Sequence, residues 1–239
     1  MLGFLLMKRA SLLLPLSLAL ALAIILSNCA TVSQQSLVWQ AKMGIVPDSK
    51  VTHGQLHQEL KVKRDFIPRG RYGRRLRRPM KAQYITIHST QNYSGDAYAH
   101  AKALKRGALR GGVCGYLCWH FTVQENVVIQ HLPTDEQGEH ADFDGPGNRT
   151  SIGIEMAEHR GNNMPQTIDR TAKLTASLMY THGIPLSHVV PHYHWPRKGY
   201  STPNKNCPHF LMDDGKPRGT WRWFLSRVKS HYDRIVAQG

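Results

Sequence analysis

Three short segments of the sequence carry side chains that commonly bind metal ions. His88 follows a β-branched run at 84–87, His192 and His194 share one loop, and Cys207 lies further along the chain. Two imidazoles and a thiolate suit zinc, and three protein ligands leave a fourth tetrahedral position for water. Zinc lowers the pKa of such a water from about 15.7 to near 7, which makes a hydroxide nucleophile at neutral pH. Because the chain holds fourteen histidines, spacing alone leaves purely structural roles for these side chains open.

The elements that must position these side chains follow from the hydrophobic pattern. Short β-branched runs predict strands, and apolar residues at helical spacing between caps and glycine stops predict helices. Thr220 is the expected N-cap of the last helix, which carries an apolar stripe. We expect an α/β fold with a mixed central β-sheet flanked by helices. The expected strands cover 84–88, 119–123, 127–132 and 151–156, and the expected helices cover 96–106, 165–182 and the residues after 220.

Composition sets limits on the class of protein. The chain has 239 residues, a formal net charge of +15 and 41% hydrophobic residues, so a wholly disordered chain is excluded. Four cysteines are too few for a small disulfide-stapled protein. Cys114 and Cys118 are four residues apart, which permits a local disulfide, but two small buried thiols fit the pattern equally well.

The first 28 residues have the layout of an export signal. Lys8 and Arg9 precede a Leu- and Ala-rich run at 10–26. The sequence Leu-Ser-Asn-Cys at 26–29 resembles a bacterial lipobox, which predicts Cys29 as the lipidated first residue of the mature protein. An uncleaved anchor helix and ordinary cleavage are the alternatives. All three place the remaining chain outside the cytoplasm, and the lipoprotein reading favours the outer membrane if the organism is Gram-negative.

Residues 29–81 are expected to be a tether that ends in a basic stretch. Residues 61–81 contain ten Lys or Arg and one acid, with glycines and prolines that argue against a long helix. Such a stretch either attracts an anionic polymer or lipid headgroups, or is simply a solvated linker. Nucleic acid is not an expected partner, because aromatic residues are scarce in this stretch. The catalytic domain is then expected to cover residues 82–239.

Several strings of residues together resemble one known family. They are His-Phe-Thr-Val at 120–123, Asn-Arg-Thr-Ser-Ile-Gly-Ile-Glu at 148–155 and Lys-Asn-Cys-Pro at 205–208. In this order they resemble the zinc-dependent N-acetylmuramoyl-L-alanine amidases of the type 2 amidase superfamily, which includes peptidoglycan recognition proteins. The resemblance covers about residues 82–212. It implies a single catalytic domain of that kind.

The resemblance also implies the roles of individual residues. His88, His192 and Cys207 correspond to the ligands of one zinc ion, with His194 as a competing ligand to His192. Glu155 corresponds to the acidic catalytic residue and Lys205 to the basic residue that stabilises the oxyanion. These two residues and three ligands form the expected catalytic centre. The further residues expected near the substrate groove are His140 and Asn148.

The implied reaction is hydrolysis of an amide bond in peptidoglycan. A zinc-bound water attacks the bond between the lactyl group of N-acetylmuramic acid and L-alanine of the stem peptide. The expected partners are peptidoglycan or muropeptides and a membrane reached through the lipid anchor, and we expect a monomer. Two alternatives remain, a non-catalytic peptidoglycan-binding module and an amidase restricted to soluble anhydro-muropeptides.

Overall fold

The computed structural model describes residues 39–236 of the chain. The signal peptide expected at 1–28 and the lipidation site expected at Cys29 lie outside these residues. Within the described part, no helix combines the length and the apolar character needed to cross a bilayer.

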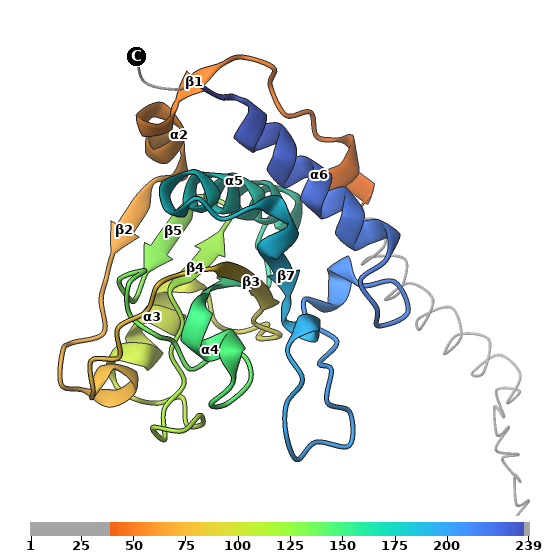
Figure 1. The fold of residues 1–239 in the computed structure, drawn as a ribbon. Helices are drawn as coiled ribbons and strands as arrows, with labels where there is room; N and C mark the ends of the chain where they lie inside the picture. Colours follow the sequence, from red (N-terminus) through yellow and green to blue (C-terminus); the bar gives the residue numbers. More distant parts are fainter. Residues whose placement is uncertain (1–38, 237–239) are drawn as a thin grey trace, which may run out of the picture. The chain divides into compact units, whose positions relative to one another are not determined.

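A six-stranded sheet forms the centre of the fold (Figure 1), in the order β2-β5-β4-β6-β3-β7. Every neighbouring pair is parallel except β4 and β5, which form an antiparallel hairpin through the turn at 125–126. The prediction of a mixed central sheet is therefore confirmed. The strands are β2 (Val62–Arg64), β3 (Tyr84–Ser89), β4 (Phe121–Gln124), β5 (Val127–Gln130), β6 (Ser151–Met156) and β7 (Val189–Pro191).

Helices cover both faces of this sheet. On one face α5 (Met164–His182) packs against β4 and β6, and α6 (Gly219–Asp233) packs on α5. On the other face α3 (Ala97–Lys105) packs against β4 and β5. The short α4 (Pro146–Thr150), which leads directly into β6, was not expected from the sequence.

Side chains alternate between the two faces along β3 and β6. Ile85 and Ile87 of β3 belong to the main hydrophobic core under α5, together with Ile152 and Ile154 of β6. Because successive residues of a strand point to opposite faces, His88 and Glu155 face away from that core. His88 and Glu155 therefore lie on the face of the sheet opposite α5.

The helix boundaries agree with the sequence except at the start of α6. Asp96 caps α3 by accepting the backbone N–H of Ala99, and Gly183 ends α5 in the left-handed conformation. The expected N-cap Thr220 lies instead inside the first turn of α6, which begins at Gly219. The reason is that the Asp213 carboxylate accepts both the backbone N–H and the hydroxyl of Thr220.

The prediction of a tether over residues 29–81 is wrong for its second half. The segment contains β1 (Val51–Thr52), which pairs with β8 (Ile235–Val236), and α2 (His53–Leu60), whose N-terminus is closed by a capping box. Leu56, Leu60 and Ile67 are fully buried. Leucines at i and i+4 on a capped helix fill one apolar stripe, and β2 then extends the central sheet. The folded domain therefore begins well before residue 82.

Candidate active site

Three buried side chains converge at the end of the sheet where β3 finishes. His88 belongs to β3, His192 opens the short 3-10 helix η3 (His192–His194), and Cys207 lies in the loop that follows. One ligand atom from each lies within 4.8 Å of the others, and all three side chains are buried. The Nδ1 atoms of His88 and His192 are 2.9 Å apart. The backbone N–H of Ser89 donates to Cys207 Sγ at 3.4 Å.

The hydrogen bonds on the far side of the two rings fix which nitrogens carry protons. His192 Nε2 is 2.9 Å from the carbonyl oxygen of Ala141, an acceptor only, so Nε2 carries the proton and Nδ1 a lone pair. His140 Nε2 is 3.3 Å from the carbonyl oxygen of Ser151 and donates to it by the same logic, which leaves His140 Nδ1 to accept. The hydrogen bond that it accepts comes from the Nε2–H group of His88, with the two nitrogens 3.0 Å apart.

Two nitrogen lone pairs are therefore turned toward each other at His88 and His192, with no proton between them. Such a contact is repulsive unless a cation lies beside both atoms. Metal-bound histidines typically donate their other N–H to a carbonyl or a polar side chain, as both do here. The donor set of two imidazoles and one thiol suits zinc and leaves a fourth position open, so these residues fit the ion that the sequence predicts.

Burial keeps the two imidazoles in the neutral form that metals bind. It is the largest cause of the lowered pKa of His88, which lies well below its usual value, and His192, His140 and Lys205 lower it further. Burial also lowers the pKa of His192 to about 3. The Cys207 thiol is affected in the opposite direction, because burial raises its pKa to about 12. Binding of a metal here must therefore displace the thiol proton.

A carboxylate lies beside this cluster. Glu155 of β6 is the direct register partner of His88 on the parallel strand β3. Its Oε1 atom is 3.9 Å from His88 Nδ1, and its Oε2 atom is buried with no hydrogen-bond partner among the described residues. Burial raises the pKa of Glu155 to about 8, although the charge of Lys205 acts against that rise. The carboxyl group can therefore both accept and release a proton near neutral pH.

Lys205 supplies positive charge to the same region. It is half-buried, and its ammonium group contributes to lowering the pKa values of Glu155, His88 and His192. A charge that acts on all three groups lies within electrostatic range of the whole cluster. The arrangement thus brings together two imidazoles, one thiol, one carboxyl group and one ammonium group, a set that could hold a metal ion beside an acid–base group.

Comparison of the chain with known proteins identifies its family. A family model described as N-acetylmuramoyl-L-alanine amidase (Amidase_2) matches residues 78–210. The chain belongs to this amidase family. Among curated proteins of Bacillus subtilis (strain 168), it is 37% identical over 173 residues to the N-acetylmuramoyl-L-alanine amidase CwlH, covering 71% of this chain and 61% of CwlH. It is 38% identical over 167 residues to the amidase XlyA, covering 69% of this chain and 50% of XlyA.

Solved structures share the fold of this chain. The catalytic domain of XlyA aligns with a TM-score of 0.58 at 37% identity, covering 70% of this chain and 99% of that domain. The structure of PlyL, at 23–26% identity in its two forms, aligns with TM-scores of 0.56 and 0.55. The chain spans only about half to three fifths of the length of the curated relatives CwlH and XlyA, whereas it covers the XlyA catalytic domain almost completely.

The two residues expected near the substrate groove lie beside the ligand cluster in the structure. His140 lies behind His88 and accepts a hydrogen bond from its Nε2–H group. Asn148 is only 2% exposed, and its Oδ1 atom accepts the backbone N–H groups of His140 and Ala141, both at 2.8 Å. A side chain so enclosed fixes the backbone of its neighbours. Both residues therefore support the ligand cluster from behind.

The close approach of His140 explains the glycine in the Ile-Gly-Ile-Glu string. A Cβ atom on Gly153 would lie 2.7 Å from His140 Nδ1 and 2.8 Å from two carbons of its ring. Real side chains do not approach so closely, so a glycine is needed for the imidazole to reach His88. The structure thereby gives a packing reason for part of the family pattern.

Two alternatives left open by the sequence are distinguished in the described residues. His192 joins His88 and Cys207, whereas His194 is exposed and lies against the Trp195 ring. Cys114 and Cys118 are both free thiols.

Sequence reasoning missed one further residue near the cluster. His209 is 3.5 Å from the Glu158 carboxylate through Nε2 and 3.3 Å from the Ser89 hydroxyl through Nδ1. Because Ser89 also donates its backbone N–H to Cys207, this network supports the thiol ligand from outside. The only indication of this residue in the sequence was that His209 follows Cys207 by two positions.

Proposed function

We propose that this chain hydrolyses the amide bond between the lactyl group of N-acetylmuramic acid and L-alanine of the peptidoglycan stem peptide, with one zinc ion held by His88, His192 and Cys207. The observation that carries the proposal is the convergence of these three ligand atoms within 4.8 Å beside the Glu155 carboxylate. Membership of the amidase family supports the type of bond. The names of the relatives CwlH and XlyA favour an enzyme over a non-catalytic recognition module.

The zinc ion, when bound, supplies Lewis-acid polarisation of the substrate carbonyl and lowers the pKa of the attacking water. Glu155 takes the proton from that water at a carboxylate oxygen and returns it to the nitrogen of the departing L-alanine. The pKa of Glu155, raised to about 8 mainly by burial, suits both transfers. General acid–base catalysis of this kind typically contributes about 10²–10⁴-fold to the rate.

Lys205 stabilises the negative charge that develops on the carbonyl oxygen. Its ammonium group acts on Glu155, His88 and His192, so it is placed to act on charge in the space that these side chains enclose. A preorganised donor or cation at such a position is worth about 3 kcal/mol of transition-state stabilisation. His140 Nδ1 accepts a hydrogen bond from the Nε2–H group of His88, which keeps His88 Nδ1 free to bind the metal.

The test compares Glu155→Gln with the unchanged chain. We expect the variant to keep one zinc per chain by elemental analysis and to lose about 10²–10⁴-fold in the release of peptides, measured by mass spectrometry. The matched control is Asp214→Asn, because the Asp214 side chain is 89% exposed and should leave the rate unchanged. A chelator should abolish cleavage by the unchanged chain, and added zinc should restore it. Full activity of Glu155→Gln would refute the assigned role.

The same assay separates the remaining alternatives. It is run with intact peptidoglycan and with soluble anhydro-muropeptides as parallel substrates. Cleavage of the soluble fragments alone restricts the substrate class to released material. Binding to glycan strands without zinc and without cleavage would move the assignment to a recognition module.

We further propose that the chain is exported, is anchored through lipid on Cys29 and acts as a monomer. The support is the charged start, apolar run and lipobox-like string at residues 8–30. Labelling with a radioactive fatty acid in a bacterial host should mark the unchanged chain and not Cys29→Ser. Light scattering after size exclusion should give the mass of one chain for the soluble domain. An unlabelled parent chain would refute the anchor.

A further inference from the structure

Two segments on the α3 side of the sheet are rich in arginine and contain no acid. Residues 66–78 and 106–118 together hold eight arginines, and neither segment includes Asp or Glu. The first segment contains the short 3-10 helix η1 (Tyr72–Arg74), and the second follows directly after α3. We call the surface that they form the arginine face.

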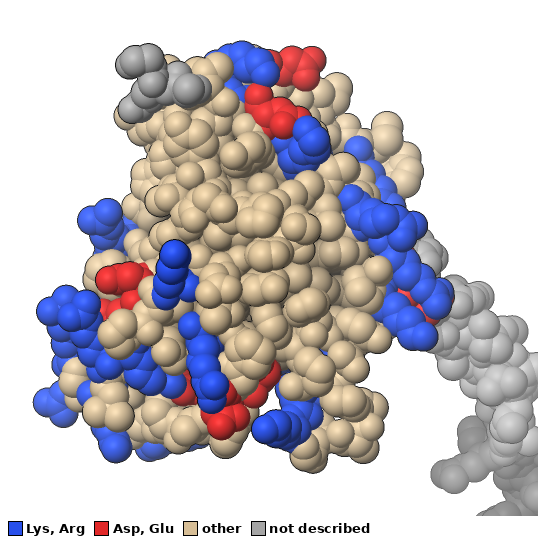
Figure 2. Space-filling view, in the orientation of Figure 1, with Lys and Arg blue, Asp and Glu red and all other residues tan. Residues whose placement is uncertain are grey.

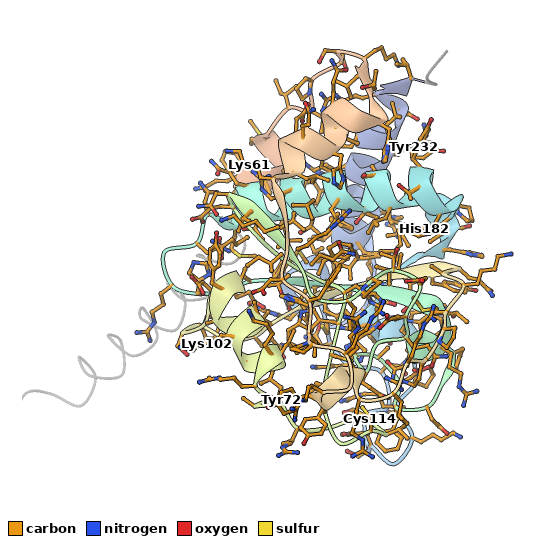
Figure 3. All side chains as sticks on the ribbon, turned by 90° about the vertical axis from the view of Figure 1, so that its left-hand side faces the viewer. Lys61, Tyr72, Lys102, Cys114, His182 and Tyr232 are labelled. Atoms are coloured by element: carbon orange, nitrogen blue, oxygen red, sulfur yellow. The ribbon has the colours of Figure 1, made fainter. Side chains whose placement is uncertain are left out.

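Aromatic and glycine contacts join the two segments into one surface. The rings of Tyr72 and Tyr116 meet edge to face with centroids 5.5 Å apart. Gly107 lies under both rings in the left-handed conformation, with no room for a Cβ atom. Gly73 lies against Cys118, and a Cβ atom on it would be 2.5 Å from the Cβ atom of Cys118. Figure 3 shows both Tyr72 and Cys114 in the lower part of the molecule. The arginine face is therefore a fixed surface built from both segments.

Most of its arginines form no ion pair among the described residues. Arg74 and Arg78 pair with Glu136 and Glu139 and anchor the first segment to the domain. The other six are exposed and form no ion pair within residues 39–236: Arg69, Arg71, Arg75, Arg77, Arg106 and Arg110. In Figure 2, Lys and Arg side chains gather at the lower left, where Figure 1 shows α3 and the segment before β3.

The use of arginine indicates the chemistry of the partner. The guanidinium group presents a planar fork of N–H donors that matches the oxygens of a phosphate group. Arg110 also lies over the Tyr116 ring, with its guanidinium carbon 4.3 Å from the ring centroid. A surface bearing many phosphate groups complements six such side chains.

Aliphatic side chains project from the same surface. Leu76, between Arg75 and Arg77, is 64% exposed, Val113 is 55% exposed and Leu117 is 36% exposed. Soluble phosphate polymers offer little apolar material for such side chains to enter. A bilayer offers both parts, because phosphate groups lie at its surface and acyl chains lie about 5–10 Å below.

We propose that the arginine face docks the domain onto a bilayer that contains anionic phospholipids, with Leu76, Val113 and Leu117 entering the interface. The six unpaired arginines bind the lipid phosphate groups. The contact is independent of any N-terminal anchor and of the chemistry at His88, His192 and Cys207. It would orient the domain on a membrane rather than leave it to rotate freely.

The test measures co-sedimentation of residues 37–239, which include the whole described fold with its core at 39–236, with lipid vesicles. Vesicles of phosphatidylcholine with 30% phosphatidylglycerol are compared with pure phosphatidylcholine. We expect binding to the anionic vesicles and a loss of about fivefold for each arginine removed, so about 25-fold for Arg75→Gln with Arg77→Gln. The charge-matched control is Lys216→Gln with Arg222→Gln. Lys216 precedes α6, Arg222 lies within it, and both are exposed, so this variant should bind as the parent does.

A second variant separates a bilayer from a soluble polymer. Leu76→Ser removes an exposed aliphatic group and keeps every charge, so it should weaken vesicle binding about tenfold. It should leave the binding of soluble glycerol-phosphate polymer unchanged. Equal vesicle binding by Leu76→Ser, or equal loss with the control pair, would overturn the proposal. Both arginine-face variants should retain the parent rate on soluble muropeptides, which keeps this test separate from the proposed activity.

Discussion

The contact between Gly153 and His140 allows a quantitative test of how the ligand cluster is supported. The perturbation is Gly153→Ala, alone and combined with His140→Ala. A methyl group on Gly153 would lie 2.7 Å from His140 Nδ1, the atom that accepts the proton of His88. Ordinary contacts between such atoms need about 3.5 Å or more, so the ring must move by about 0.8 Å. The hydrogen bond of 3.0 Å to His88 then stretches beyond a useful length.

Two opposing effects set the expected change in the free energy of unfolding. Overpacking of this kind costs about 1–3 kcal/mol. Replacing a strand glycine by alanine returns about 0.5–1 kcal/mol, because the unfolded chain loses freedom. We therefore expect Gly153→Ala to destabilise the parent chain by about 1 kcal/mol, within a range of about 0–2.5 kcal/mol. In the His140→Ala background the ring is absent, and the same change should be neutral or stabilising.

The assay is urea unfolding of the four chains in the presence of a chelator, so that metal binding does not contribute. The control is Gly54→Ala in α2, where the nearest atom to a new Cβ lies at 3.9 Å and a stabilisation of about 0.5–1 kcal/mol is expected. Zinc competition with a coloured chelator should show an affinity about 10–100-fold weaker for each single variant. If Gly153→Ala costs the same with and without His140, the contact does not explain the glycine and the reasoning fails.

Two further predictions concern stability. Leu56→Ala should lower the free energy of unfolding in urea by about 2–5 kcal/mol, because Leu56 is fully buried, whereas Gln58→Ala, at an exposed position, should be neutral. Equal effects of the two changes would indicate that this segment is a tether and not part of the folded domain. For Asp169, burial raises the pKa, but hydrogen bonds from His231 and Arg227 outweigh it and lower the pKa to about 2. Its contribution of about 2 kcal/mol is present above pH 4 and is lost as the pH falls toward 2. The stability difference between the parent chain and Asp169→Asn should therefore shrink over that range, and a constant difference would contradict this assignment.

Local patterns in the sequence were sufficient for the elements that carry the ligands. The β-branched run before His88 and the string that ends at Glu155 are both strands, and the helix stopped by Gly183 is α5. Spacing alone did not separate His192 from His194. The structure separates them because Ala141 accepts the Nε2 proton of His192, a contact between residues 51 positions apart.

Other features depend on contacts that no local pattern encodes. The role of His140 follows from its approach to both His88 and Gly153, which belong to two different strands. The burial of Leu56 follows from the packing of α2 on α5, and its surroundings in the sequence are polar. In both cases the deciding partner is distant in the chain, so composition and period give no indication of it.

The relation between the core and the chemistry follows from the strand period. Ile85 and Ile87 are the register partners of Ile152 and Ile154, and all four lie in the core under α5. A shift of either strand by one residue would turn these isoleucines to the opposite face and bury His88 or Glu155 in apolar surroundings. The free energy of burying the isoleucines therefore excludes that register. Side chains without any chemistry of their own thus keep the carboxylate of Glu155 within 3.9 Å of the His88 ring.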